Sequence, residues 1–139
     1  MKPPSAGLFA TAATLAVLAA VVAGLVASGS PGHVRLQRLD AARAMNLQAI
    51  SNLVASHYRA HGSVPTSLAE LAGNPGWLDQ QLRDPVSRAA YDYRAIDSVS
   101  YEICARFDTE STMARTQAVT PQNFSVHGAG RQCFTGHVP

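Results

Sequence analysis

An uncharged apolar stretch from Gly7 to Ala27 most limits what this chain can fold into. No charged residue occurs between Pro3 and Gly32. As an α-helix, a run of this length crosses the roughly 30 Å of hydrocarbon in a bilayer. The apolar core of a cleavable signal usually spans only about 7 to 15 residues, so the length favours a retained signal-anchor. Cleavage after Ser28 is the alternative, because Val26 and Ser28 are small residues at the positions that a signal peptidase recognises.

Small residues recur every four positions in this stretch and predict a helix face that a second helix can approach closely. Chance recurrence in an alanine-rich segment is the alternative explanation. The predicted partners are membrane lipid, other membrane or envelope proteins, and a second copy of the chain packed through the apolar helix. The face consists of Ala12, Ala16, Ala20, Gly24 and Ser28.

The rest of the chain has room for one modest domain. Of the 139 residues, we assign 1–32 to the N-terminal tail, the anchor and a Gly/Pro break, and 33–139 to a single domain. The net charge is only +2 and the 11 Lys and Arg form no run, so nucleic acid is not an expected partner.

The two cysteines, Cys104 and Cys133, are most simply paired in one disulfide if the domain lies in an oxidising compartment. Such a bond would stabilise the domain by on the order of 3 kcal/mol. Two buried free thiols in a cytosolic protein are the alternative. Neither cysteine has the spacing of a redox or zinc motif.

A long amphipathic helix is predicted from about Val34 to His61, ending at Gly62. Its apolar positions recur at three- and four-residue spacing, which suits a helix packed on a sheet. The predicted apolar face carries Leu39, Leu47, Ile50, Val54 and Tyr58, and the predicted polar face carries Arg38, Arg43, Gln48, Asn52 and Arg59.

A short helix is predicted after Gly62, because Ser67 and Glu70 have the spacing of a capping box, with Leu68 and Leu71 turned inward. Turns are predicted at residues 74–76 and at Asp84-Pro85. Between these turns, Trp77 and Leu78 are expected to cover the core.

Strand signals begin only at Tyr91. Alternating aromatic and polar residues predict a hairpin of strands 91–95 and 101–107, turning near Asp97, and a last strand at either 124–127 or 132–134. The fold class is therefore α+β: a transmembrane helix, then a long amphipathic helix packed on a small antiparallel sheet of three or four strands. The polar stretch 108–122 is predicted to be a long loop.

No catalytic residue, metal site or cofactor is predicted. His57 and His61 stand four apart on one helix and could face one metal ion, but the H-E-x-x-H pattern is absent, and exposed histidines at a helix end explain them equally well. No nucleophile elbow of the form G-x-S-x-G occurs.

Several short features together resemble the type IV pilin-like proteins, in particular the pseudopilins of type II secretion. They are the apolar helix with its helical continuation, a Gly-x-x-Pro-x-Ser-Leu-x-x-Leu passage from Gly62 to Leu71, an Asp-Pro turn and a Tyr-x-Tyr strand. The family's processing motif is missing, because Gly7 precedes Leu8 and Ala12 stands where the family has Glu. The family's acidic calcium loop is also missing, because 128–139 contains no Asp or Glu.

The resemblance implies a non-enzymatic, single-pass protein of the inner membrane that serves as a structural or assembly component. The alternative is a secreted or anchored extracytoplasmic binding module for a small ligand or a partner protein, with 108–122 as its contact surface. Flanking charges alone, Lys2 against Arg35, Arg38 and Arg43, favour a cytoplasmic C-terminus. The short N-terminal tail, the cysteine pair and the resemblance instead favour a periplasmic or extracellular domain.

Overall fold

The structure is a computed structural model that describes residues 6–27, 30–72, 80–111 and 123–139. The chain forms two compact units, Met1–Arg35 and Leu36–Pro139, each of which is described by itself. The predicted turn at 74–76, the positions of Trp77 and Leu78, and Ser28 lie outside the described residues. So does most of the predicted loop 108–122.

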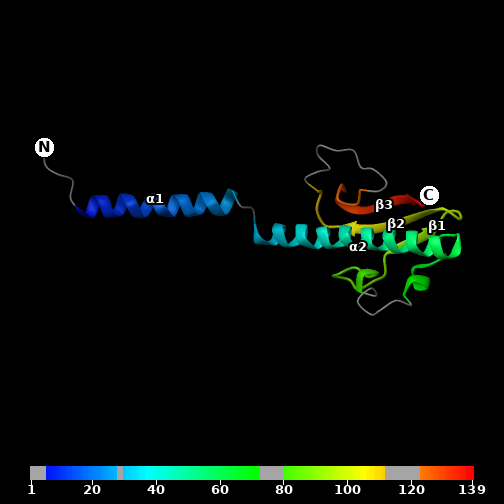
Figure 1. Cartoon of the computed structure of the whole chain (residues 1–139). Coiled ribbons are helices and arrows are strands. Elements are labelled where there is room, and N and C mark those ends of the chain that lie inside the picture. Colours follow the sequence, from blue (N-terminus) through cyan, green and yellow to red (C-terminus); the bar gives the residue numbers. More distant parts are fainter. Residues whose placement is uncertain (1–5, 28–29, 73–79, 112–122) are drawn as a thin grey trace. The chain divides into compact units, whose positions relative to one another are not determined.

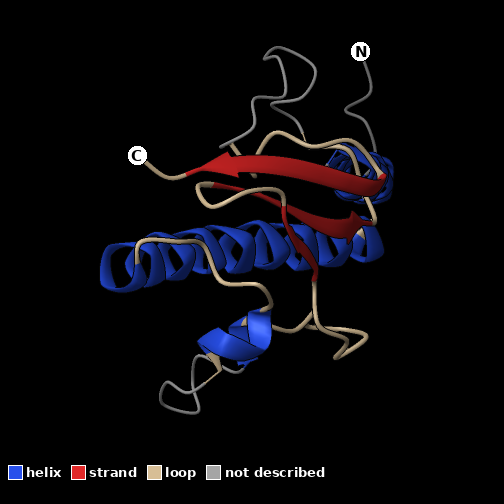
Figure 2. Cartoon of the chain, turned by 90° about the vertical axis from the view of Figure 1, so that its right-hand side faces the viewer, coloured by secondary structure: helices blue, strands red, loops and turns tan. Residues whose placement is uncertain are grey.

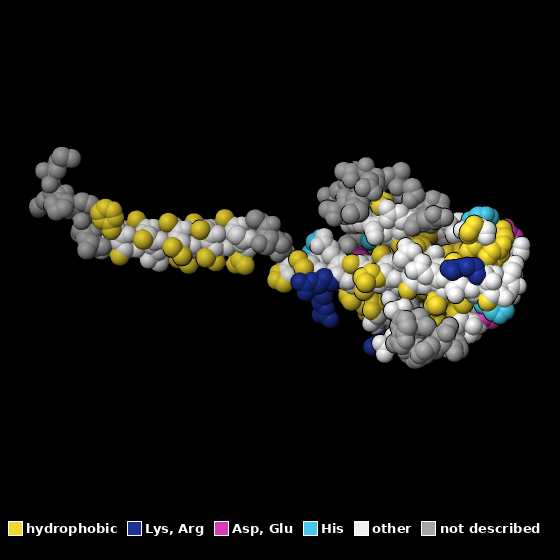
Figure 3. Space-filling model, viewed as in Figure 1, with side chains coloured by type: hydrophobic (Ala, Val, Ile, Leu, Met, Phe, Trp, Pro, Cys, Tyr) yellow, Lys and Arg dark blue, Asp and Glu magenta, His cyan; other side chains and the backbone are white. Residues whose placement is uncertain are grey.

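The first unit contains helix α1 (Ala6–Ala27), whose 22 residues include no charged side chain. Its large apolar side chains are exposed, with Leu15 66% and Val26 77% accessible. Figure 3 shows these apolar side chains along the visible face of α1. The hydroxyls of Thr11 and Thr14 donate back to the helix carbonyls of Gly7 and Ala10. These bonds satisfy the polar atoms of the two threonines within the helix itself.

Helix α2 (Pro31–His61) begins slightly earlier than the sequence predicts. Ser30 caps it, since its hydroxyl accepts a hydrogen bond from the His33 amide at 3.3 Å, and proline is well suited to the first helical position. Gly62 ends the helix as predicted, with φ of +76° and its amide bonded to the Tyr58 carbonyl at 2.7 Å. A backbone angle of this kind favours glycine.

Three antiparallel strands form one sheet in the order β1 (Asp92–Ala95), β2 (Ser100–Phe107), β3 (Gly130–His137). This confirms the predicted α+β class and the hairpin of the first two strands. The last strand matches the second predicted location, 132–134, and is longer. The long strands run alongside α2 (Figures 1 and 2).

The core of the second unit lies between α2 and the sheet. Leu47, Ile50 and Val54 of the helix are fully buried, as the predicted apolar face requires. The facing positions of β3 alternate with exposed ones, and those of β2 alternate with less buried ones except at Cys104, which is the pattern of a sheet with one covered face. The main strand residues in this core are Tyr101, Ile103, Ala105, Phe107 and Phe134.

The short helix η1 (Leu68–Leu71) buries Leu68 and Leu71 as predicted, but the predicted capping box is wrong. The Ser67 side chain makes no cap hydrogen bond. The Glu70 carboxylate instead accepts hydrogen bonds from the amide and hydroxyl of Thr66. The hydrogen bond that a capping box would form between Glu70 and the Ser67 amide is therefore made one residue earlier, at the Thr66 amide.

Candidate functional site

A buried guanidinium organises the most polar part of the second unit. Arg43 of α2 donates to Asp84 at 2.6 Å, to Asp40 at 2.7 Å and to Asp108 at 2.7 Å. We call these four residues the Arg43 cluster. The predicted placement of Arg43 on the polar face of the helix is wrong: its side chain is only 6% exposed. The reason is that three carboxylates offset the cost of removing the charge from water.

Asp40 is the most deeply buried carboxylate of the cluster, at 2% exposure. It accepts hydrogen bonds from the amides of Asp108 and Thr109, the Thr109 hydroxyl and Arg43. Burial by itself would raise the pKa of the Asp40 carboxyl, but these donors outweigh burial and hold the pKa below its ordinary value. Asp40 therefore stays ionised and fixes the chain where β2 ends.

Asp84 joins the cluster from the predicted Asp-Pro turn, which the structure confirms. Its carboxylate accepts the Val86 and Ser87 amides at 2.9 and 2.8 Å as well as Arg43. Burial opposes ionisation here too, yet the bonds from Arg43 and from the turn amides lower the pKa of Asp84. Position 84 was predicted as a turn residue only, because its side-chain partner is distant in sequence.

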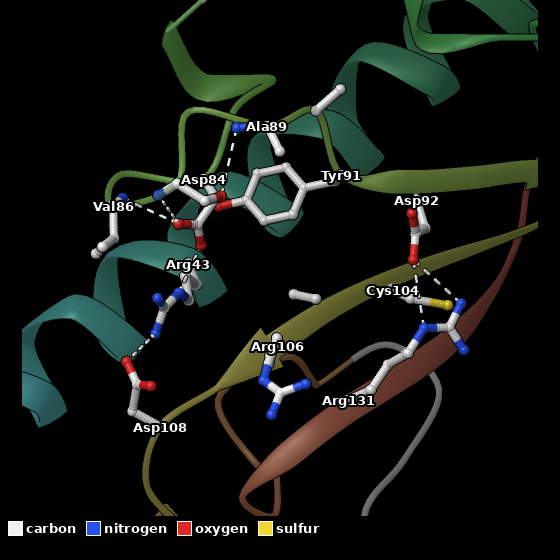
Figure 4. A pocket seen from close by; sticks show the side chains of 13 residues that line it. Arg43, Asp84, Val86, Ala89, Tyr91, Asp92, Cys104, Arg106, Asp108 and Arg131 are labelled. Carbon is white, nitrogen blue, oxygen red and sulfur yellow. Dashed lines mark hydrogen bonds and ion pairs between the residues drawn. The ribbon is translucent and has the colours of Figure 1, made fainter.

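A pocket of about 320 Å³ opens beside the Arg43 cluster (Figure 4). Arg43, Asp84 and Asp108 line one end, and Asp92, Arg106 and Arg131 line the other. We call this cavity the charged pocket. Tyr91 also lines it. Burial raises the pKa of Tyr91 to about 12, so its hydroxyl is neutral, and the hydroxyl oxygen accepts a hydrogen bond from the Asn46 side-chain amide. The pocket thus presents fixed charges of both signs, an arrangement suited to binding an ionic group.

Cys104 and Cys133 form a disulfide between β2 and β3, at positions that are partners in the strand register. Their Cα atoms are 4.1 Å apart. Cys104 is buried and lines the charged pocket, whereas Cys133 is exposed. Glu102 lies near the two sulfurs, but a disulfide offers no thiolate to a metal ion.

The two helix histidines contact each other. The rings of His57 and His61 stack with centroids 4.1 Å apart, and His61 Nδ1 lies 3.0 Å from the His57 carbonyl. His57 Nε2 is 3.8 Å from Glu70. Of the other histidines, His127 stacks on Phe107 and His137 contacts Ser100. The described contacts therefore pair each of these four rings with its own protein neighbour.

The small residues of the predicted helix face, where described, all lie on α1 and are exposed. Ala12, Ala16, Ala20 and Gly24 leave space around the helix, since a Cβ built on Gly24 meets nothing within 4 Å. Comparison with known proteins finds no matching family, no matching curated protein and no matching solved structure.

Proposed function

We propose that this chain is a non-enzymatic, single-pass membrane-anchored envelope protein that serves as a pilin-like or pseudopilin-like structural component. The observation that carries the proposal is α1: it is apolar on all sides and its apolar side chains are exposed. Such a helix suits lipid rather than water. Its 22 residues span about 33 Å at 1.5 Å per residue, enough for the hydrocarbon layer.

The second unit supports the same proposal through its layers. A helix packed on a small antiparallel sheet is the layout that the pilin-like resemblance implies, and the disulfide fits an oxidising envelope compartment. The proposed location is the inner membrane with the domain on its periplasmic or extracellular side. Because the family's processing motif is missing, we propose a pilin-like protein outside the set of processed filament subunits.

Membrane insertion can be tested with a charge at the centre of α1. We expect the full chain to stay in the membrane pellet after alkaline carbonate extraction, and Leu18→Arg to be found in the soluble fraction, because a central arginine costs about 2.5 to 3.5 kcal/mol of insertion free energy. Leu36→Arg is the matched control, since Leu36 is an exposed leucine of α2. Extraction of the unaltered chain by carbonate would contradict the anchor.

Assembly can be tested separately with a photo-crosslinking residue in α1. At Ala16, on the small-residue face, we expect crosslinks to a second copy or to another envelope protein. At Leu18, which is rotated about 200° around the helix, we expect lipid adducts instead. Crosslinks that are equal at both positions, or absent from both, would contradict a packing role for this face.

A binding module is the second candidate function, and the charged pocket favours it. Most of the contact surface expected at 108–122 lies outside the described residues, so the pocket is the stronger basis. A monomeric anchored chain that holds a ligand there would support this function over assembly.

A further inference from the structure

Two arginines oppose each other across the strands that border the charged pocket. Arg106 of β2 and Arg131 of β3 are register partners in an antiparallel pair, so their side chains leave the same face of the sheet. Both line the pocket, as Figure 4 shows. Like charges directly opposite one another destabilise a strand pair. In Figure 4 the Arg131 guanidinium is turned toward Asp92. An anion that bound both arginines would draw it away from Asp92 and reduce this repulsion.

The protein itself compensates these charges only in part. Arg131 contacts Asp92 at 3.2 Å, but both side chains are more than half exposed, and such pairs contribute little. Within the part of the chain that the structure describes, the Arg106 side chain makes no hydrogen bond or ion pair, and its backbone pairs with β3. The pocket therefore has guanidinium donors free to bind a ligand.

The remaining charges limit which anion fits. Asp84 and Asp108 are bonded to Arg43 at the far end of the pocket, yet the cluster as a whole has more carboxylates than guanidinium groups. A second negative charge on the ligand would be repelled by these carboxylates and by Asp92. The volume of about 320 Å³ is at the lower limit for ligand pockets. A small ligand with a single carboxylate meets both conditions, and arginine binds carboxylates with favourable geometry.

We propose that the charged pocket binds the carboxylate of a small monoanionic ligand, with Arg106 and Arg131 as its binding residues. Asp92 competes with the ligand for Arg131. This proposal rests on the binding-module candidate and names its ligand class. It is independent of membrane anchoring and of assembly, so its failure would leave those two proposals untouched.

The test is an NMR titration of the ¹⁵N-labelled full chain in uncharged detergent micelles. Sodium propionate and N-acetyl-dialanine each carry one carboxylate, and sodium chloride at equal ionic strength is the reference. We expect saturable shifts of the Arg106 and Arg131 amides with the carboxylates and weaker binding of succinate. Tighter binding of propionate would indicate that the natural ligand is a small organic acid, and tighter binding of N-acetyl-dialanine would indicate the C-terminal end of a peptide.

Three variants make the outcome decisive. Arg106→Gln should weaken binding about tenfold, the usual effect of losing one charge-assisted hydrogen bond. Asp92→Asn should tighten binding, because it releases Arg131. Arg94→Gln is the matched control: Arg94 is an exposed arginine of β1 that pairs with Glu102 and does not line the charged pocket.

Opposite changes in the first two variants cannot arise from a general loss of folding. Saturable binding with an unchanged Arg94→Gln variant supports the site. The proposal is overturned if neither carboxylate gives saturable shifts, if chloride gives the same shifts, or if Arg94→Gln weakens binding as much as Arg106→Gln.

Discussion

Arg43 joins three segments that are far apart in the sequence: helix α2, the turn at Asp84, and the chain at Asp108 where β2 ends. A buried ion pair is not in itself a sign of high stability, because desolvation opposes the attraction between the charges. Removing one partner is different, since it leaves the others buried without compensation. The cluster is therefore more sensitive to single substitutions than to replacement as a whole.

Arg43→Ala should lower the free energy of unfolding by about 3 to 5 kcal/mol, because Asp40 loses its cation in a buried setting. The measurement is urea unfolding of the full chain in micelles, followed by tryptophan fluorescence or circular dichroism. Arg38→Ala is the control, since Arg38 is an exposed residue of the same helix, and it should change stability by less than about 0.5 kcal/mol. Equal effects of the two substitutions would show that the cluster does not stabilise the fold.

Acid should weaken the fold through the same carboxylates. The pKa values of Asp40 and Asp84 lie below the ordinary 3.8 in the folded chain. At a pH between these lowered values and 3.8, the two carboxyl groups therefore bind more protons in the unfolded chain than in the folded chain. The stability that the two ionised carboxylates contribute is complete above pH 3.8 and is lost as the pH falls through their lowered pKa values.

Thermal unfolding from pH 6 to pH 2 measures this dependence. Asp84→Asn should start from lower stability and lose less of it on acidification, because one of the titrating groups is gone. A melting temperature that stays constant down to pH 2 would contradict the account.

Among the elements, the pairing of β2 with β3 depends on one close contact. Gly136 lies opposite Tyr101, and a Cβ added to Gly136 would be 2.2 Å from the ring. The tyrosine is held in place by burial and by its hydroxyl, which donates to the Ser51 hydroxyl at 2.7 Å. The glycine thus provides the space that the aromatic ring fills.

Gly136→Ala should therefore destabilise the domain by about 1 to 3 kcal/mol through overpacking. Gly128→Ala is the control, because its nearest neighbour is the flexible end of Gln132 at 3.4 Å. Chemical unfolding of both variants in parallel gives the comparison. A Gly136→Ala variant as stable as Gly128→Ala would mean that the ring moves aside at no cost.

The elements that the sequence predicted well are those with a regular apolar period. The spacing of Leu47, Ile50 and Val54 predicted α2, and alternation predicted β1 and β2. Strand β3 was only one of two alternatives, because Gln132 and Gly136 occupy its inward positions, where the sequence pattern leads one to expect large apolar residues.

The Arg43 cluster was missed because a charged residue was assigned to the polar face by type. Its position gave a signal, since Arg43 precedes Leu47 by one helical turn and so shares the buried face. The partners Asp84 and Asp108 could not be found in this way. Their meeting depends on the tertiary path of the chain, which periodicity does not report.

For the molecule as a whole, the most useful property to measure is the side of the membrane on which the domain of the proposed anchored protein lies. If the domain lies outside the cytoplasm, Cys104 and Cys133 should react with a membrane-impermeant maleimide in intact cells only after reduction. Labelling without reduction, from the cytoplasmic side alone, would contradict both the oxidising compartment and the proposed location. A variant with serine at both positions is the control for unspecific labelling.

The disulfide also determines how such a protein would respond to mechanical force. If α1 is the proposed anchor, a load that enters through it and leaves near the C-terminus passes from Cys104 directly to Cys133. The chain between them, a separation of 29 residues, would otherwise contribute roughly 100 Å of extension. With the disulfide closed, that length of chain cannot be pulled out, and the stretched domain lengthens by that much less.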